Sequence, residues 1–161
     1  MSETENASEI KMPFPWKKQI RVISLGLLKN KEGKILVHLG HDPVKQEKFY
    51  RPLGGGVDYG ETSEAAVVRE FQEELGLKVR VKSAPRVFEN IYTYYGRPGH
   101  EVVFIYEIEF EDERAYSRET FEIIENGEVS GIAAWVSRED VKREGDRLYP
   151  SGVLPFVWMG K

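Results

Sequence analysis

The sequence of 161 residues contains no cysteine. This absence excludes disulfide bonds, thiolate catalysis and cysteine metal sites, and it fits a reducing compartment. No apolar run reaches the roughly 18 residues that a membrane-spanning helix needs. The acidic, polar N-terminus does not resemble a secretory signal. We therefore expect a cytoplasmic protein without a membrane partner.

Net positive charge is also lacking, because 23 Lys and Arg stand against 27 Asp and Glu and the formal net charge is −4. This balance gives no support to electrostatic binding of nucleic acid, so we expect no nucleic-acid partner. The length predicts a single domain over residues 16–161, with a core that begins near Trp16. Residues 1–15 are predicted to form a disordered tail.

Segments rich in β-branched and aromatic residues predict strands at 19–28, 34–39, 78–82, 87–95, 101–110 and 132–136. The glycine run 54–56 is expected to break regular structure, and the acidic stretch 107–128 is expected to be irregular. A short helix is predicted at 137–144, and no internal repeat is present. Strands flanked by helices predict an α/β sandwich with a mixed sheet.

A central helix is predicted over residues 63–75, with Thr62 as its N-cap and Gly76 as its C-terminal stop. Its apolar stripe consists of Val67, Val68, Phe71 and Leu75. Three acids lie at spacing i, i+3 and i+4, in an arc of about 100° beside this stripe: Glu70, Glu73 and Glu74. Crowded like charges destabilise a helix by a few tenths of a kcal/mol per pair. We therefore expect these carboxylates to face away from the core and to bind a divalent cation.

A fixed pattern runs through residues 55–77. Gly55 is followed by five residues, Glu61, seven residues and then REFQEELGL from Arg69 to Leu77. Every specified position matches G-x5-E-x7-R-E-U-x-E-E-x-G-U, where U is a bulky apolar residue. The chain therefore resembles the Nudix hydrolase family, and the likeness in strand order extends over roughly residues 17–145. This resemblance implies a Nudix-type α/β/α sandwich with a central mixed β-sheet.

The resemblance also implies an activity and a cofactor. The expected reaction is Mg²⁺-dependent hydrolysis of a phosphoanhydride bond in a nucleoside diphosphate linked to a moiety X, such as a dinucleoside polyphosphate or a (d)NTP. Mn²⁺ is a possible substitute, and the enzyme is expected to be a monomer or homodimer. The residues implied as catalytic are Arg69, Glu70, Glu73 and Glu74. Those implied as metal ligands are Glu70, Glu73, Glu74, the Gly54 carbonyl and Glu128.

The roles within this set differ. Glu70 is either a metal ligand or the base that takes a proton from water, while Arg69 is expected to orient Glu73. Glu128 is preferred over Glu125 as an additional acid from the loop before the last strand. The residues expected to bind substrate are Arg51, Gly55, Tyr92 and Tyr94. A surface arginine and ordinary strand tyrosines are the alternatives for three of these four.

Three other interpretations compete with an enzyme of this class. The first is an acidic helix face that is simply exposed to solvent, because most runs of charged residues are of this kind. The second is a catalytically silent domain that binds a nucleotide as a sensor. An isomerase on this fold would need additional catalytic groups such as cysteine, and the chain has none. The complete set of Arg69 and three glutamates favours the hydrolase, because a pure binding domain has no chemical need for clustered carboxylates.

Overall fold

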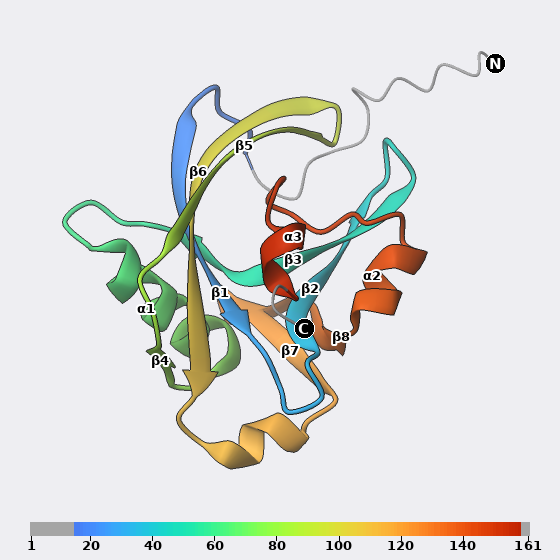
Figure 1. The fold of residues 1–161 in the computed structure, drawn as a ribbon. Coiled ribbons are helices and arrows are strands. Elements are labelled where there is room, and N and C mark those ends of the chain that lie inside the picture. Colours follow the sequence, from blue (N-terminus) through green and yellow to red (C-terminus); the bar gives the residue numbers. More distant parts are fainter. Residues whose placement is uncertain (1–14, 159–161) are drawn as a thin grey trace.

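The computed structural model describes residues 15–158, which form an α/β fold (Figure 1). Its strands are β1 (Ile20–Leu28), β2 (Ile35–Asp42), β3 (Glu47–Gly56), β4 (Val79–Val81), β5 (Arg86–Tyr94), β6 (Arg97–Phe110), β7 (Thr120–Glu125) and β8 (Glu128–Val136). Its helices are α1 (Ser63–Leu75), α2 (Arg138–Arg143) and α3 (Leu154–Val157), with a 3-10 turn over Glu113–Ser117. In this part of the chain, no helix is long and apolar enough to cross a membrane.

The strands form a mixed sheet in the order β4-β6-β1-β3-β2-β8-β7, with β5 also paired to β6. The β1–β6 pair is parallel and all other pairs between strands are antiparallel. Figure 1 shows that the long β5–β6 hairpin curls away from the α1 end of the sheet.

Helix α1 begins and ends where the sequence predicts. The Thr62 hydroxyl accepts a hydrogen bond from the backbone N–H of Ala65 at 3.1 Å. Gly76 ends the helix with φ of 66°, a left-handed conformation that glycine adopts without steric cost. Phe71 of α1 packs on β1 at Gly26, where an added Cβ would lie 2.9 Å from the Phe71 ring. The absence of a side chain at this position therefore allows the helix to approach the sheet.

Two hydrophobic clusters cover the two faces of the sheet. The first contains Val67 and Phe71 of α1, packed with Leu53 of β3. The second contains Val141 of α2 and Val157 of α3. Figure 1 shows α1 on one side of the sheet and α2 and α3 on the other, which is the layering that the sequence predicts.

Some predictions about the elements are wrong. The glycines 54–56 do not break regular structure, because β3 continues through Gly56 and pairs with β1. The stretch 107–128 is mostly ordered and includes β7, whose Phe121 and Ile123 are buried. Trp16 does not begin the core, since 37% of its surface is exposed. The predicted tail lies outside the described residues except for Pro15, so both its disorder and the predicted domain bounds stay predictions.

Candidate active site

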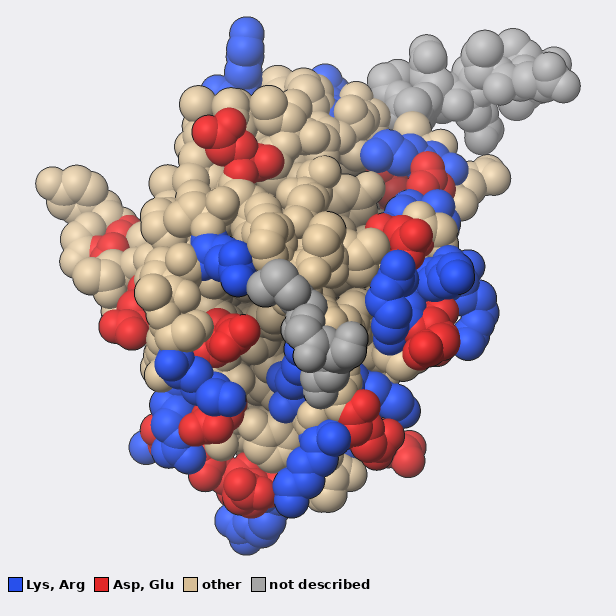
Figure 2. All heavy atoms as spheres, viewed as in Figure 1, with Lys and Arg blue, Asp and Glu red and all other residues tan. Residues whose placement is uncertain are grey.

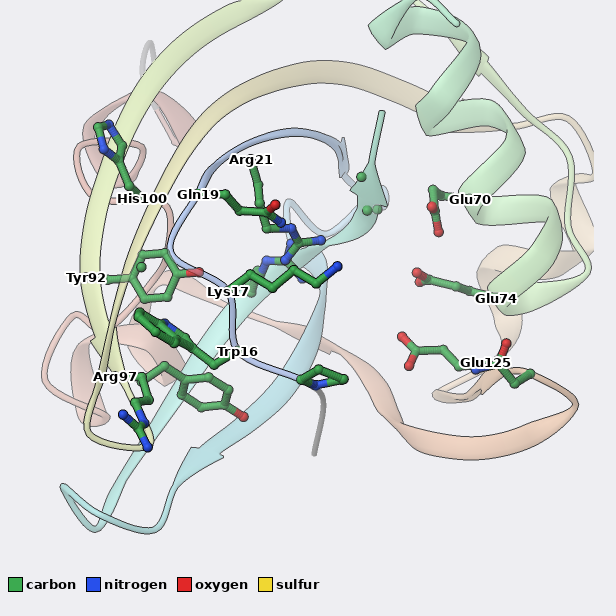
Figure 3. Close-up of a pocket in the computed structure, with 18 of the residues that line it drawn as sticks. Trp16, Lys17, Gln19, Arg21, Glu70, Glu74, Tyr92, Arg97, His100 and Glu125 are labelled. Carbon is green, nitrogen blue, oxygen red and sulfur yellow. The ribbon is translucent and has the colours of Figure 1, made fainter. Parts of the chain in front are cut away.

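A cavity of about 950 Å³ lies between α1 and the β5–β6 hairpin, a volume in the range of small-molecule sites. Figure 3 shows three carboxylates that point into it from one side, namely Glu70, Glu74 and Glu125. The labelled residues on the other side are Trp16, Lys17, Gln19, Arg21, Tyr92, Arg97 and His100. The lining also includes Arg51, Gly54, Gly55, Glu73 and Tyr94. The cavity thus brings together all the residues expected to be functional except Arg69 and Glu128.

Glu70 and Glu74 lie one helical turn apart and form a close carboxyl pair. Glu74 is only 7% exposed. Burial raises its pKa well above the usual carboxyl value, and the charge of Glu70 and a hydrogen bond between the two groups raise it further. The expectation that these acids face away from the core is therefore wrong for Glu74. It holds for Glu73, whose side chain is 58% exposed.

Gly55 provides the space in which the Glu70 carboxyl group lies. A Cβ built on Gly55 would be 2.7 Å from the carboxyl carbon of Glu70, which is closer than real contacts allow. A side chain at position 55 would therefore displace the Glu70 carboxyl group, whereas no backbone atom of β3 or α1 stands in its way. This contact explains in physical terms why a glycine stands 15 positions before Glu70, the first of the three acids Glu70, Glu73 and Glu74 (the acidic triplet).

Arg69 connects the glycine-rich end of β3 to the acids of α1. Its guanidinium donates two hydrogen bonds to Glu61, at 2.7 and 2.8 Å, and one to the Gly56 carbonyl at 3.0 Å. The other nitrogen, Nη1, donates to Glu70 at 3.0 Å and to Glu73 at 3.2 Å. The hydrogen bonds from Arg69 to Glu61, together with one from the Asp58 backbone N–H, lower the pKa of Glu61 to about 2. Arg69 thus contacts Glu73 as expected, but it also fixes Glu70 and the β3–α1 loop.

If the acids of α1 hold a metal ion, we expect Arg69→Lys to lower the activity of this site by about 10- to 100-fold, the usual cost of removing a group that orients metal ligands. A lysine ammonium cannot donate to Glu61, Gly56 and Glu70 at once, because it lacks the planar array of N–H groups. The turnover rate and the metal concentration for half-maximal activity measure the effect. Arg80→Lys is the matched control, since Arg80 pairs with Glu109 on the surface at 2.7 Å. Wild-type activity of Arg69→Lys would contradict this role.

The acids on the α1 side of the cavity fit a hard divalent cation. Within residues 15–158, no group of three His, Asp or Glu is arranged as a preformed metal site. Mg²⁺ usually takes only one or two carboxylates and completes its shell with water and substrate phosphates. Glu70, whose side chain is 15% exposed, and the buried Glu74 form a donor set of this kind, and the charge of Glu125 is close enough to raise the pKa of Glu74 further. A cation bound here would offset the repulsion between these carboxylates.

The loop acid that lies in the cavity wall is Glu125, whereas Glu128, the one preferred from the sequence, lies outside the lining. Phe121 and Ile123 of β7 pack in the same core cluster as α1, and beyond the register shift that follows Ile123 both Ile124 and Glu125 line the cavity. Glu128 is exposed at the start of β8, beyond the turn. The apolar residues Phe121 and Ile123, two positions apart, were the sequence signal that could have indicated a strand leading to Glu125.

Cations opposite the carboxylates were largely missed by the sequence interpretation. Arg51 was expected here, but Lys17 and Arg21 were not. Among the described residues, Lys17 and Arg51 have no carboxylate within ion-pair distance, and Arg21 has only Glu101 at 4.0 Å. The Arg51 charge acts against the burial-induced rise in the pKa of Glu74. These cations are therefore available for an anionic ligand.

Two tyrosines of β5, Tyr92 and Tyr94, also line the cavity. The Tyr92 hydroxyl donates a hydrogen bond to the buried Glu101 at 2.8 Å. Burial, followed by the charge of Glu101, raises the pKa of Tyr92. Burial also raises the pKa of Tyr94 to about 12. Both side chains are therefore neutral at physiological pH and offer rings and hydroxyl groups rather than charge.

Comparisons with known proteins place this geometry in context. The sequence matches the family model described as NUDIX domain over residues 18–155. A comparison with curated proteins gives no match.

Solved structures with a similar fold include a NUDIX hydrolase from Nitrosomonas europaea, with 15% identity and a TM-score of 0.58 over 83% of this chain and 82% of that one. The MutT protein from Methanosarcina mazei Go1 is 17% identical with a TM-score of 0.54, over 89% of this chain and 94% of that one. A MutT NUDIX hydrolase from Burkholderia pseudomallei is 25% identical with a TM-score of 0.50, over 76% and 87%. The predicted α/β sandwich with a central mixed sheet is confirmed.

Proposed function

The chain belongs to the NUDIX family, and from this premise we propose that it is a metal-dependent hydrolase that cleaves a phosphoanhydride bond in a nucleoside diphosphate linked to a moiety X. The observation that carries the proposal is the pair of Glu70 and the buried Glu74 in one wall of the cavity, with Glu74 pointing across the cavity toward Lys17 (Figure 3). The wall that carries the glutamates suits a cation, and the wall that carries Lys17 suits phosphates. Dinucleoside polyphosphates and (d)NTPs are candidate substrates.

In the proposed mechanism, Glu70, Glu73 and Glu74 would hold the cation, and the Gly54 carbonyl would be a further ligand. Bound Mg²⁺, or Mn²⁺ in its place, supplies charge neutralisation and lowers the pKa of a water molecule. Arg69 keeps Glu70 and Glu73 in place through its two Nη1 hydrogen bonds. The candidates for the base that takes the proton of the attacking water are Glu70 and Glu125, because both carboxylates point into the cavity.

Substrate phosphates are proposed to bind the cations of the facing wall. Arg51 lies on β3 within two residues of the leucine that precedes the glycine run, so it reaches the cavity beside Gly54 and Gly55. Lys17 points across the cavity toward Glu74 (Figure 3). Anionic phosphates held between these cations and a metal on the acidic wall would have their charge neutralised from both sides. Tyr92 and Tyr94 then remain to contact the uncharged part of the substrate.

The proposal includes a small-molecule nucleotide as the ligand and neither nucleic acid nor membrane as a partner. On the face drawn in Figure 2, basic and acidic side chains of the described residues are interspersed rather than separated by sign. With a net charge of −4, this distribution lacks the electrostatic footprint of nucleic-acid binding. A cytoplasmic location and a monomeric or homodimeric state complete the proposal.

The test is a panel of nucleoside diphosphate derivatives, dinucleoside polyphosphates and nucleoside triphosphates, assayed with Mg²⁺, with Mn²⁺ and with EDTA. Chromatographic separation of substrate and products reports cleavage of the anhydride without a coupling enzyme. We expect hydrolysis of at least one class with either metal and none with EDTA. Nucleotide binding without hydrolysis of any compound would instead support a sensor domain.

A further inference from the structure

Trp16 lines the cavity, and its indole N–H is bonded within the protein. Its indole N–H donates a hydrogen bond to the Pro98 carbonyl at 2.8 Å. The Arg97 guanidinium lies 5.6 Å from the centre of its ring. These contacts tie the segment before β1 to the tip of the β5–β6 hairpin, 82 residues further along the chain. The indole is thus anchored by its N–H while 37% of the residue stays exposed.

An exposed, immobilised indole in a cavity wall is suited to stacking. Aromatic rings and arginine guanidinium groups both bind the flat face of a nucleobase, and such stacking tolerates any base. A tryptophan that served only to complete the core would bury its ring, as Phe71 does in α1. Trp16 instead satisfies its N–H within the protein and leaves ring surface available to a ligand.

The position of Trp16 relative to the charges sets the orientation of the ligand. Trp16 and Arg97 lie on the side of the cavity opposite Glu70 and Glu74, and Lys17 reaches into the space between them (Figure 3). A ligand that spans this arrangement has a planar ring at one end and phosphates toward the other. We propose that Trp16 and Arg97 form the nucleobase subsite of the cavity, with Lys17 contacting the adjacent phosphates.

This inference rests on the proposed function for the location of the phosphates, but its test does not depend on turnover. The probes are adenosine 5′-(α,β-methylene)diphosphate and methylenediphosphonate, which contain the same non-hydrolysable P–C–P group with and without the nucleoside. Isothermal titration calorimetry with Mg²⁺ measures the affinity of each probe. Stacking on one aromatic side chain corresponds to about 5- to 150-fold in affinity. We therefore expect the wild type to bind the nucleoside probe at least about fivefold more tightly.

Two substitutions separate the roles of neighbouring residues. Trp16→Ala is expected to remove the preference for the nucleoside probe and to leave the affinity for methylenediphosphonate within about twofold. Trp16→Phe keeps a ring and should keep most of the preference. Lys17→Ala is the matched control, because it should weaken both probes and leave their ratio unchanged. In the wild type, the nucleoside probe should also quench tryptophan emission, and Trp16→Phe should abolish this quenching.

Three results would overturn the nucleobase subsite: equal affinity of the wild type for both probes, an unchanged preference in Trp16→Ala, or an equal loss for both probes in Trp16→Ala. The last would assign Trp16 a purely structural role as the anchor between the N-terminal segment and the hairpin. If Trp16→Ala does not fold, the quenching measured with the wild type and Trp16→Phe decides the matter. Failure of the hydrolysis panel would leave these binding ratios measurable, so the two proposals fail separately.

Discussion

Glu74→Gln is expected to lower the turnover rate at least about 100-fold at saturating Mg²⁺ while the chain stays folded. The substitution keeps the size and shape of the side chain and removes only its ability to become a carboxylate. A neutral amide is a much weaker ligand for a hard divalent cation. Because Glu74 is the most buried acid of the triplet, no neighbouring water can readily replace its contribution.

The stability of Glu74→Gln follows from the same burial. Burial and the neighbouring Glu70 disfavour the charged form of Glu74 in the metal-free protein, which is why its pKa is raised. Glutamine corresponds to the neutral form and can still hydrogen-bond to Glu70. The melting temperature of the metal-free variant should therefore equal or exceed that of the wild type, and Mg²⁺ should stabilise the variant less than the wild type.

Two further variants define what this result means. Glu73→Gln is also expected to lower turnover by at least about 100-fold, if Glu73 serves as a ligand. Glu64→Gln is the matched control, because Glu64 is an exposed acid in the first turn of the same helix. Circular dichroism establishes that each variant is folded. Near wild-type hydrolysis by both Glu73→Gln and Glu74→Gln at saturating Mg²⁺ would refute the proposed role of the triplet.

The boundaries of α1 could be predicted from the sequence because they depend on local chemistry. The hydroxyl of Thr62 and the left-handed conformation of Gly76 act within one turn of the helix ends. The burial of Glu74 was predicted wrongly although a signal existed. Glu74 lies seven residues after Val67 and three after Phe71, which places it on the buried stripe rather than beside it. An ionisable residue type does not by itself indicate exposure, because burial can hold a carboxyl group in its neutral form.

The cationic and aromatic wall could not be predicted, because it depends on long-range packing. Trp16 and Lys17 precede the first predicted strand, and nothing local indicates that this segment returns across the tip of the β5–β6 hairpin. The sequence does not distinguish Glu125 from Glu128 by position, because the strand that brings Glu125 to the cavity, β7, lies in a stretch that reads as irregular. The carboxylates of α1 share one element, whereas the opposite wall combines four separate segments of the chain.

Gly54→Ala is expected to destabilise the fold by more than about 3 kcal/mol, which lowers the melting temperature by at least about 6 °C. Gly54 has φ of 145°, a conformation that residues with a side chain rarely adopt. An added Cβ would also clash with the Ser24 carbonyl oxygen and lie 2.8 Å from Cα of Leu25. Both atoms belong to the backbone of β1, so neither can move aside as a flexible side chain would.

Relief of this clash would disrupt more than one strand pair. Gly54 pairs with Leu25 in the β1–β3 register. The Ser24 hydroxyl donates to the Ser63 carbonyl at the start of α1 at 2.6 Å. A shift of β1 away from β3 would therefore also move the helix that carries the carboxylates. We expect Gly54→Ala to lose stability and activity together, with both measured on the same preparation.

The adjacent glycines serve as graded controls for this prediction. Gly56→Ala should change stability by less than about 1 kcal/mol, because its new methyl group meets only Arg21 Nη2, at 3.7 Å. Gly55→Ala should stay folded but lose activity, since its methyl group would displace the end of the Glu70 side chain and no backbone. Equal stability of all three variants would contradict the packing of β3 against β1. If instead Gly55→Ala kept full activity, the position of the Glu70 carboxylate would not matter for the reaction.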